Sequence, residues 1–336
     1  MQITDAKKTT QTDLLSQIRH PVRDDLKATD ILICHELISR VPLIQTITQH
    51  IVSSGGKRLR PLLVLLSAGA CSYEKNDNEH HELAAIIEFV HTATLLHDDV
   101  IDESKLRRGK ATANAQWGNQ ASVLVGDFLY SRAFQILARR SNIPVMKCLA
   151  DTTNAIAEGE VWQLMNQNNP DISIDDYYQV IHHKTAKLFA SAAEIGAMIA
   201  EQNESTRAAM ANYGLQLGMA FQILDDLLDY CSDAKTMGKN IGDDLAEGKV
   251  TLPLIYAMQT APTQQADEIR HAITNASIEN FHSILQTLKA TNAIDYSRAQ
   301  AQNYADQAMT MLDHLAPSAY REALSQLVTF AVARSY

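Results

Sequence analysis

Apolar residues recur at three- and four-residue steps along almost the whole of this 336-residue chain. The segment HELAAIIEFVHTATLLHDD shows one apolar stripe, formed by Leu83, Ile86, Ile87, Val90 and Leu95. Such spacing places side chains on one face of an α-helix. Alternating apolar and polar runs are absent, as are the Asn-Gly and Asp-Gly pairs of tight hairpins. The sequence therefore predicts an all-α fold.

Only short segments interrupt the helical pattern, and none is long or simple enough to link two domains. They are SSGGKRLRP (53–61), SYEKNDNEH (72–80), RRGKAT (107–112), SNIP (141–144), NQNNPDIS (166–173) and APTQQ (261–265). Ser173, followed by Asp175 and Asp176, predicts a capped helix start. We expect residues 16–336 to form a single large helical domain of roughly ten or more helices, and the polar residues 1–15 to fray.

Net charge, cysteine spacing and hydropathy exclude several classes of protein. Acidic residues outnumber basic ones by 39 to 29, a formal net charge of −10, whereas nucleic-acid-binding proteins usually carry the opposite sign. The four cysteines show no CxxC or Cys/His metal spacing, which indicates reduced thiols in a cytoplasmic protein. No signal-peptide pattern and no apolar run of roughly 20 residues is present, so we expect no transmembrane segment.

The segment LLHDDVIDESKLRRG, at residues 95–109, gathers charge at the end of an apolar helix. Asp98 and Asp102 lie four residues apart, so both carboxylates project from one helix face. Like charges at that spacing repel, and a bridging cation reverses the sign of the interaction. Carboxylate oxygens, water and substrate phosphates are the ligands that Mg²⁺ prefers. Asp99 lies about 100° around the helix and suits a supporting position.

The acidic pattern recurs in QILDDLLDY, where another apolar helix carries Asp225, Asp226 and Asp229. One DDxxD alone is equally compatible with a solvated acidic face. Two of them on otherwise apolar helices indicate two facing walls of one metal-filled cavity.

Basic residues accompany both acidic motifs. They are Arg107 and Arg108 before Gly109, Lys57, Arg58 and Arg60 in a glycine-opened turn, Lys184 after two histidines, and Lys239 and Lys249 around Asp243 and Asp244. Any one of these cations could belong to an ordinary solvated surface. Together, arginine forks and lysine charges beside Mg²⁺-binding carboxylates indicate a diphosphate ligand.

Two ExxH pairs suggest a different metal chemistry. Glu88 with His91, and Glu279 with His282, have the spacing used by di-iron carboxylate bundles. Such sites need two further inward-facing glutamates, and the second pair lies in a polar segment, SIENFHSIL. This interpretation leaves both DDxxD motifs and the arginines unexplained, so Mg²⁺ and a diphosphate are favoured.

From about residue 50 to about residue 255, the chain resembles the trans (all-E) isoprenyl diphosphate synthases. The motifs that carry the resemblance follow in order: GGKRLRP, LLHDDVIDESKLRRGK, GDFLYSRAF, KTAKLFASA, FQILDDLLDY and GKNIGDDLAEGKVTLPLIYA. Within the family, the chain is most similar to the bacterial long-chain synthases that make the side chains of respiratory quinones. Residues 260–336 hold no motif that assigns them a role.

The resemblance implies an all-α homodimer with a central cavity and one active site per subunit. It implies a prenyltransferase that condenses an allylic diphosphate, such as farnesyl diphosphate, with successive isopentenyl diphosphates. About three Mg²⁺ ions would be held in each site. The product would be a long all-trans chain, octaprenyl or nonaprenyl diphosphate, for ubiquinone or menaquinone. Transient membrane contact during product release is compatible with this function.

The resemblance also assigns roles to residues of the matching motifs. The principal Mg²⁺ ligands would be Asp98, Asp102 and Asp225, supported by Asp99, Asp226 and Asp229. The allylic diphosphate would be held by Arg107, Lys184, Lys239 and Lys249. Isopentenyl diphosphate would be held by Lys57, Arg60, His91 and Arg108. Residues close to the reacting carbons would be Thr185, Phe221 and Gln222.

These roles describe a carbocation reaction. Neutralising the leaving diphosphate lets the allylic C–O bond ionise. The isopentenyl double bond then attacks the cation, and the departing diphosphate accepts the proton that is lost. Thr185 and the Phe221 ring would stabilise positive charge without being alkylated.

Product length is expected to depend on the apolar helix before the first acidic motif. Ala93 and Thr94, one turn before Asp98, are small enough to leave a tunnel open, although close helix packing would also use such residues. Short-chain members of the family commonly carry aromatics here. Leu137 and Leu149 are the candidates for the tunnel floor.

Other functions within the same fold fit less well. A terpene cyclase would lack a use for Lys57, Arg60 and Arg108, which imply a second diphosphate substrate. A non-catalytic subunit of a heteromeric synthase would tend to carry degraded acidic motifs, whereas both are intact. A synthase that stops at farnesyl or geranylgeranyl diphosphate stays open as an alternative.

Overall fold

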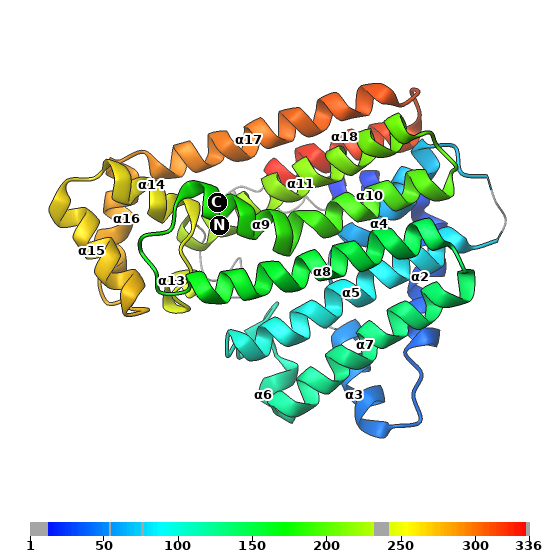
Figure 1. The fold of residues 1–336 in the computed structure, drawn as a ribbon, viewed down its shortest axis with the longest axis horizontal. Helices are drawn as coiled ribbons and strands as arrows, with labels where there is room; N and C mark the ends of the chain where they lie inside the picture. The colour runs from blue at the N-terminus through cyan, green and yellow to red at the C-terminus, as the bar shows by residue number, and fades with distance from the viewer. Residues whose placement is uncertain (1–12, 54, 75–76, 232–241, 334–336) are drawn as a thin grey trace.

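The computed structural model describes residues 13–53, 55–74, 77–231 and 242–333, and these are almost entirely helical (Figure 1). The all-α prediction is therefore confirmed. Residues 13–19 are helical, so the last three residues of the segment expected to fray belong to a helix. The remainder of that segment lies outside the described residues.

The elements follow one another with short connections. Those of the first half are η1 (His20–Val22), α2 (Arg23–Glu36), α3 (Pro42–Ser53), α4 (Leu59–Ala70), α5 (Glu79–Ile101), β1 (Leu106–Arg107), β2 (Lys110–Ala111), α6 (Ala113–Trp117), α7 (Asn119–Arg140) and α8 (Ile143–Asn166). Those of the second half are α9 (Ile174–Ile181), η2 (His182–Ala186), α10 (Lys187–Ile199), α11 (Glu204–Cys231), α13 (Asp243–Ala246), α14 (Leu252–Thr260), α15 (Thr263–Thr274), α16 (Phe281–Ala290), α17 (Ala293–Met311), η3 (Leu312–His314) and α18 (Ala319–Val332).

Two apolar helices form the centre of the bundle. In α4 and α10 nearly every residue is buried, because apolar or small side chains occupy all their faces. Helix α10 packs against α4 on one side and α11 on another, and α5 packs against both α4 and α7. The long helices run roughly alongside one another, with α17 and α18 at one side and α3, α6 and α7 at the other (Figure 1).

Small residues allow the central helices to approach closely. A Cβ atom added to Gly214 of α11 would overlap the carbonyl oxygen of Phe189 and lie 2.8 Å from Cα of Ala190, both on α10. Because these are backbone atoms, neither can move aside without shifting a helix. The α10–α11 contact thus depends on the missing side chain.

Gly214→Ala is therefore expected to lower the free energy of unfolding by about 1–3 kcal/mol, the usual cost of overpacking a core. Urea unfolding monitored by circular dichroism would measure the loss. Asn212→Ala, at an exposed position of the same helix, serves as the control and is expected to change stability by less than about 0.5 kcal/mol. Equal stabilities of the Gly214 variant and the wild type would contradict the role of this contact.

One small β-hairpin departs from the helical prediction. Leu106–Arg107 pairs with Lys110–Ala111 around a turn in which Arg108 and Gly109 have φ values of 54° and 74°. Positive φ at both central residues is the condition for a type I′ turn. The sequence did not predict it, because arginine replaces the usual asparagine or aspartate at the first left-handed position.

The capped start predicted at Ser173 is confirmed. The Ser173 hydroxyl accepts a hydrogen bond from the Asp176 amide at 3.1 Å, and the Asp176 carboxylate accepts one from the Ser173 amide at 3.0 Å. This reciprocal pair satisfies two amides at the start of α9. It fixes the entry to the helix that leads into η2 and the cavity described below.

Candidate active site

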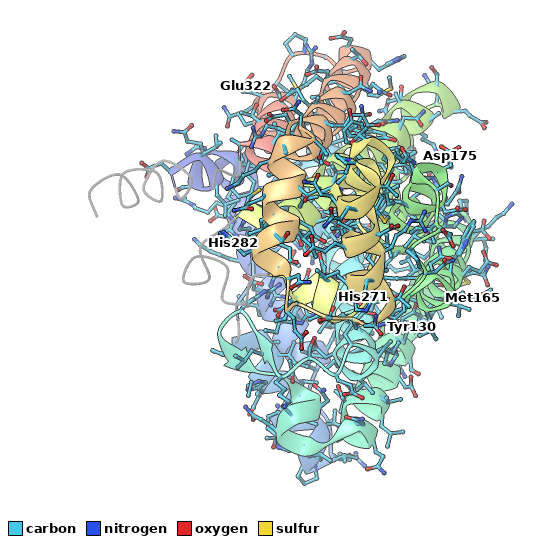
Figure 2. The ribbon with its side chains drawn as sticks, turned by 90° about the vertical axis from the view of Figure 1, so that its left-hand side faces the viewer. Tyr130, Met165, Asp175, His271, His282 and Glu322 are labelled. Carbon is cyan, nitrogen blue, oxygen red and sulfur yellow. The ribbon has the colours of Figure 1, made fainter. Side chains whose placement is uncertain are left out.

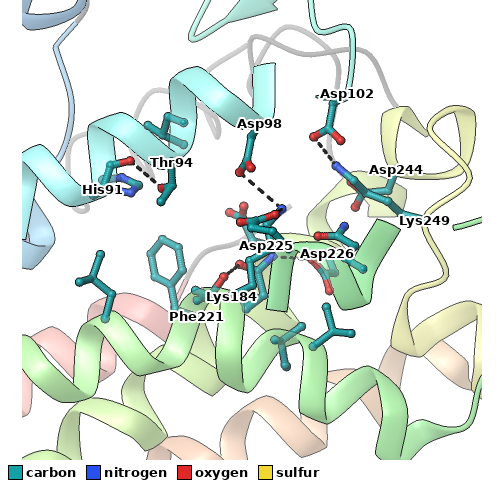
Figure 3. A pocket seen from close by; sticks show the side chains of 18 of the residues that line it. His91, Thr94, Asp98, Asp102, Lys184, Phe221, Asp225, Asp226, Asp244 and Lys249 are labelled. Carbon is teal, nitrogen blue, oxygen red and sulfur yellow. Dashed lines mark hydrogen bonds and ion pairs between the residues drawn. The ribbon is translucent and has the colours of Figure 1, made fainter. Parts of the chain in front are cut away.

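A cavity of about 680 Å³ lies between α5, α8, η2 and α11, and the loop before α4 lines its edge (Figure 3). Acidic and basic side chains line one part of its wall. Its apolar lining includes Leu95, Ile156, Leu188 and Phe221. The cavity therefore offers a charged region joined to an apolar one.

Two of the three aspartates of the first motif face lysines from other elements. Asp98 lies 3.4 Å from Nζ of Lys184, and Asp102 accepts a hydrogen bond of 2.7 Å from Lys249 (Figure 3). Helix α5 ends at Ile101, where the partial negative charge of its C-terminus disfavours carboxylates. The two lysines offset that cost, and the predicted spacing of Asp98 and Asp102 along one wall is observed.

Asp99 occupies a different environment from its neighbours. Its side chain is buried and does not line the cavity, and its carboxylate accepts a 2.9 Å hydrogen bond from Arg107 Nε. Asp99 thus positions Arg107, whose side chain does line the cavity. The supporting position expected for Asp99 is compatible with this contact, although the residue it supports is an arginine.

The second motif faces the first from α11. Asp225, Asp226 and Asp229 all line the cavity, and Asp244 of α13 joins them. Asp226 accepts hydrogen bonds from Tyr177 at 2.6 Å and Gln222 at 2.7 Å. Burial, and then the charge of Asp244, raises the pKa of Asp226 to about 8. These crowded carboxylates fit a site for hard divalent cations, because bound positive charge would relieve their repulsion.

A π-helical turn delivers two further predicted residues. In η2 the backbone widens over His182–Ala186, and Lys184 and Thr185 project into the cavity. Gly159 of α8 permits the close crossing, because a Cβ there would lie 2.7 Å from the Lys184 amide nitrogen. The Thr185 hydroxyl donates a 2.9 Å hydrogen bond to Gln222. Turns of this kind occur often at functional sites.

Arginines gather at the edge of the cavity. Arg60 lies 4.5 Å above the Phe189 ring, and its NH1 group donates to Nε2 of His91 at 3.0 Å. Burial and the nearby arginines lower the pKa of His91 well below its usual value, so the ring is neutral and can accept that bond. Arg108 donates to the Gly55 carbonyl oxygen, and Lys57 lies 5.0 Å above the Phe330 ring.

Arg58 and Arg108, at this edge, both have left-handed backbone conformations, with φ values of 48° and 54°. Residues other than glycine adopt this conformation at an energetic cost. The Arg58 guanidinium forms an ion pair with Glu88 from α5. The backbone thus turns both arginines toward one region at some cost in stability.

Besides Asp99, three predicted residues do not line this cavity. Ala93, Leu137 and Leu149 are buried in the main apolar core and do not line the cavity, whereas Thr94 does. Lys239 lies outside the described residues. Of the predicted acidic and basic site residues that the structure describes, all but Asp99 line this cavity. Of the four residues expected to set product length, only Thr94 lines it.

Sequence reasoning missed a polar stripe on α8. Glu160, Gln163 and Asn166 all line the cavity, and Glu160 accepts a 2.5 Å hydrogen bond from Lys184. Burial raises the pKa of Glu160 to about 7, although the charge of Lys184 opposes the shift. The sequence does show polar residues at three-residue steps on this helix, between apolar residues such as Val161 and Leu164. That spacing could have indicated a polar face directed at the cavity. Glu160 is thus a cavity-lining carboxylate outside the two predicted metal motifs.

Two raised carboxyl pKa values predict how the metal-free protein responds to pH. Folded Glu160 and Asp226 hold protons up to about pH 7 and 8, whereas the unfolded chain releases them near pH 4. The folded state thus binds more protons, and their contribution to stability falls as pH rises through this window. Urea unfolding in EDTA at several pH values should show a steeper decline for the wild type than for Glu160→Gln with Asp226→Asn. Identical slopes would contradict the prediction.

The di-iron interpretation is not supported by the positions of its residues. Glu88 is paired with Arg58, and His91 with Arg60. The second pair lies at the start of α16, where His282 contacts Gln286 near the end of the molecule shown in Figure 2. Within the described part of the chain, neither ExxH pair belongs to a cluster of metal-ligating atoms.

Comparisons with known proteins agree with the resemblance that the motifs show. The Polyprenyl synthetase family model matches residues 41–288. Octaprenyl diphosphate synthase of Escherichia coli (strain K12) is 46% identical over 321 residues, covering 95% of this chain and 99% of that protein. All-trans-nonaprenyl-diphosphate synthase (geranyl-diphosphate specific) of Rhodobacter capsulatus is 46% identical over 322 residues, covering 96% and 98%.

A solved structure extends the agreement to the fold. Polyprenyl synthase from Caulobacter crescentus CB15, complexed with calcium and isoprenyl diphosphate, has a TM-score of 0.91 and 39% identity. The match covers 95% of this chain and 98% of that one. The resemblance inferred from the motifs is therefore confirmed, and the chain belongs to the polyprenyl synthetase family.

Proposed function

We propose that this protein, a prenyltransferase by its family, elongates an allylic diphosphate with successive isopentenyl diphosphates to a long all-trans polyprenyl diphosphate. The observation that carries the proposal is one cavity in which two acidic motifs face each other between lysines and arginines. Its apolar region gives a growing hydrocarbon a place to lie. The assignment of residues 16–336 to a single domain is part of the proposal.

The allylic diphosphate would lie between α5 and α11. Asp98, Asp102 and Asp225 would hold about three Mg²⁺ ions, with Asp226 and Asp229 nearby. Bound Mg²⁺ supplies charge neutralisation to the leaving group. The remaining diphosphate oxygens would be bound by Arg107, which Asp99 holds in place. Lys184 and Lys249, which contact Asp98 and Asp102, would bind them as well. Lys239 keeps the same predicted role.

Isopentenyl diphosphate would bind at the arginine-rich edge. Arg60, Arg108 and Lys57 supply positive charge there, and His91 is held beside Arg60. The ion pair between Arg58 and Glu88 fixes the first turn of α4, which carries Arg60. A second diphosphate would thus lie next to the first, with its double bond directed toward the allylic carbon.

The remaining residues suit the carbocation step. The Phe221 ring and the Thr185 hydroxyl line the cavity beside Gln222 and could stabilise positive charge. The departing diphosphate is the proposed proton acceptor. Glu160 does not change this assignment, because its carboxylate already accepts a hydrogen bond from Lys184. Its role here is to hold that lysine over the diphosphate.

We place the product at octaprenyl or nonaprenyl diphosphate, a quinone side-chain precursor, because relatives with those names are equally similar to this chain. Cytoplasmic location and homodimerisation remain predictions. Exposed apolar side chains on α7 and α8, such as Leu124 and Met165, support a protein or membrane contact. Met165 is labelled in Figure 2. Within the described residues, the helices are all too short or too polar to cross a membrane.

One assay tests the proposal. The purified protein is given Mg²⁺, labelled isopentenyl diphosphate and either geranyl or farnesyl diphosphate, and the products are sized by chromatography. Mg²⁺-dependent products of about eight or nine isoprene units are expected. Products that stop at farnesyl or geranylgeranyl length would favour the short-chain alternative. Absence of any elongation would overturn the enzyme assignment.

A further inference from the structure

A cluster of two histidines and an aspartate lies where α2 packs against the start of α5. The Asp25 carboxylate oxygen Oδ1 lies 3.3 Å from Nε2 of His80 and 3.0 Å from Nε2 of His81. All three ligand-type atoms lie within 4.8 Å of one another. This cluster belongs to neither acidic motif, and none of its residues lines the cavity described above.

The spacing of these atoms matches a small coordination sphere. Zn²⁺ bonds to imidazole nitrogen and carboxylate oxygen are about 2.0–2.2 Å, so neighbouring ligand atoms of a tetrahedron lie about 3.3 Å apart. Both oxygen–nitrogen distances are close to that edge length. The distance between the two nitrogens is at most 4.8 Å, so only this third edge would need to shorten to admit an ion.

The two rings are suited to bind as neutral ligands. Their centroids lie 3.9 Å apart, so protonating both would bring two positive charges together. A neutral imidazole keeps a lone pair for a metal.

The surroundings also favour positive charge and a water ligand. Asp77 accepts a hydrogen bond from the Glu79 amide, and Glu79 and Glu82 belong to the first turn of α5, so three further carboxylates lie near the cluster. The Asp25 side chain is 39% exposed, whereas those of His80 and His81 are 15% and 12% exposed. Solvent can thus reach the oxygen side of the cluster, where a fourth ligand would bind.

We propose that Asp25, His80 and His81 bind a borderline divalent cation of the Zn²⁺ class and so join α2 to the first turn of α5. Two nitrogens and one oxygen select for such ions, whereas the all-oxygen motifs of the cavity select for Mg²⁺. His80 lies 18 residues before Asp98, about 27 Å along the helix. The ion therefore stabilises the N-terminal helices and takes no part in elongation.

Metal counting tests the proposal directly. EDTA-treated protein is dialysed against Zn²⁺ with excess Mg²⁺, and bound zinc is measured for the wild type and for His80→Gln with His81→Gln. The matched control is His271→Gln with His282→Gln, two exposed histidines at the far end of the molecule (Figure 2). The cluster variant is expected to lose one zinc per chain, and the control variant none.

Two further readouts separate this site from the carboxylates of the cavity. Co²⁺ in a site of low coordination number with two imidazole ligands gives a strong absorption band in the visible range. This band should be missing in the cluster variant. Zn²⁺ should raise the thermal midpoint of the wild type, but not of the cluster variant, by about 3 °C or more. Elongation with Mg²⁺ should be the same in both proteins, so the result does not depend on the proposed function.

Some outcomes would overturn the site. Equal zinc content in the wild type and the cluster variant would mean that the three residues form only a hydrogen-bonded contact. If the double variant does not fold, Asp25→Asn removes one ligand at a partly exposed position and keeps its shape. The proposal would also be contradicted if Asp25→Asn kept the bound zinc and had the same Co²⁺ spectrum as the wild type.

Discussion

Asp98→Asn is expected to lower the rate of elongation by about a thousand-fold, the range seen when one preorganised electrostatic contact is removed. The amide has the shape of the carboxylate but no charge to hold a cation beside Asp102 and Asp225. Stability of the metal-free protein should change little, because Lys184 loses its contact with the Asp98 charge but keeps its contact with Glu160. Steady-state assays with labelled isopentenyl diphosphate and urea unfolding in EDTA would measure the two effects.

Asp151→Asn, at an exposed position of α8, is the control and should leave the rate unchanged. Asp99→Asn makes a sharper comparison, because Asp99 contacts Arg107 and does not line the cavity. Its loss should act mainly on the KM for the allylic diphosphate, by about ten-fold. An equal loss of kcat in Asp98→Asn and Asp99→Asn would contradict the separate roles given to these two aspartates, cation binding for Asp98 and positioning of Arg107 for Asp99.

Most of the fold could be predicted from patterns among residues that are close in the sequence. The three- and four-residue periodicity depends only on which face of a helix is apolar, so α5 and α11 could be placed from their own residues. The cap at Ser173 was equally predictable, because its partner Asp176 lies three residues away. The hairpin around Arg108 was not, since its left-handed arginine is stabilised by a contact with Gly55, more than fifty residues earlier.

The site was predictable where one helix supplied both members of a pair. Asp98 and Asp102 lie on one wall because the helical repeat places them there. The contacts across the cavity required the tertiary structure: Lys184 reaches Asp98 and Glu160 only because η2 widens and crosses α8 at Gly159. Nothing in the sequence near Lys184 marks a π-helical turn.

Thr94→Phe is expected to shorten the product to about three or four isoprene units, because Thr94 lies one helical turn, about 6 Å, before Asp98. Figure 3 shows its side chain on the same face of the cavity as Asp98, opposite the helix that carries Phe221. A phenyl ring there would block the path from the acidic motifs to the apolar region. Chromatography of the dephosphorylated products would measure the change.

Thr94→Val is the matched control, because it keeps the volume of threonine and removes only the hydroxyl that donates to the His91 carbonyl oxygen. It should leave the product length unchanged. Ala93→Tyr should also shorten the product, but Ala93 is buried behind the wall, so it should cost about 1–3 kcal/mol of stability as well. Wild-type products from Thr94→Phe would show that the growing chain follows another wall, and Ile156 and Leu188 would then be the residues to enlarge.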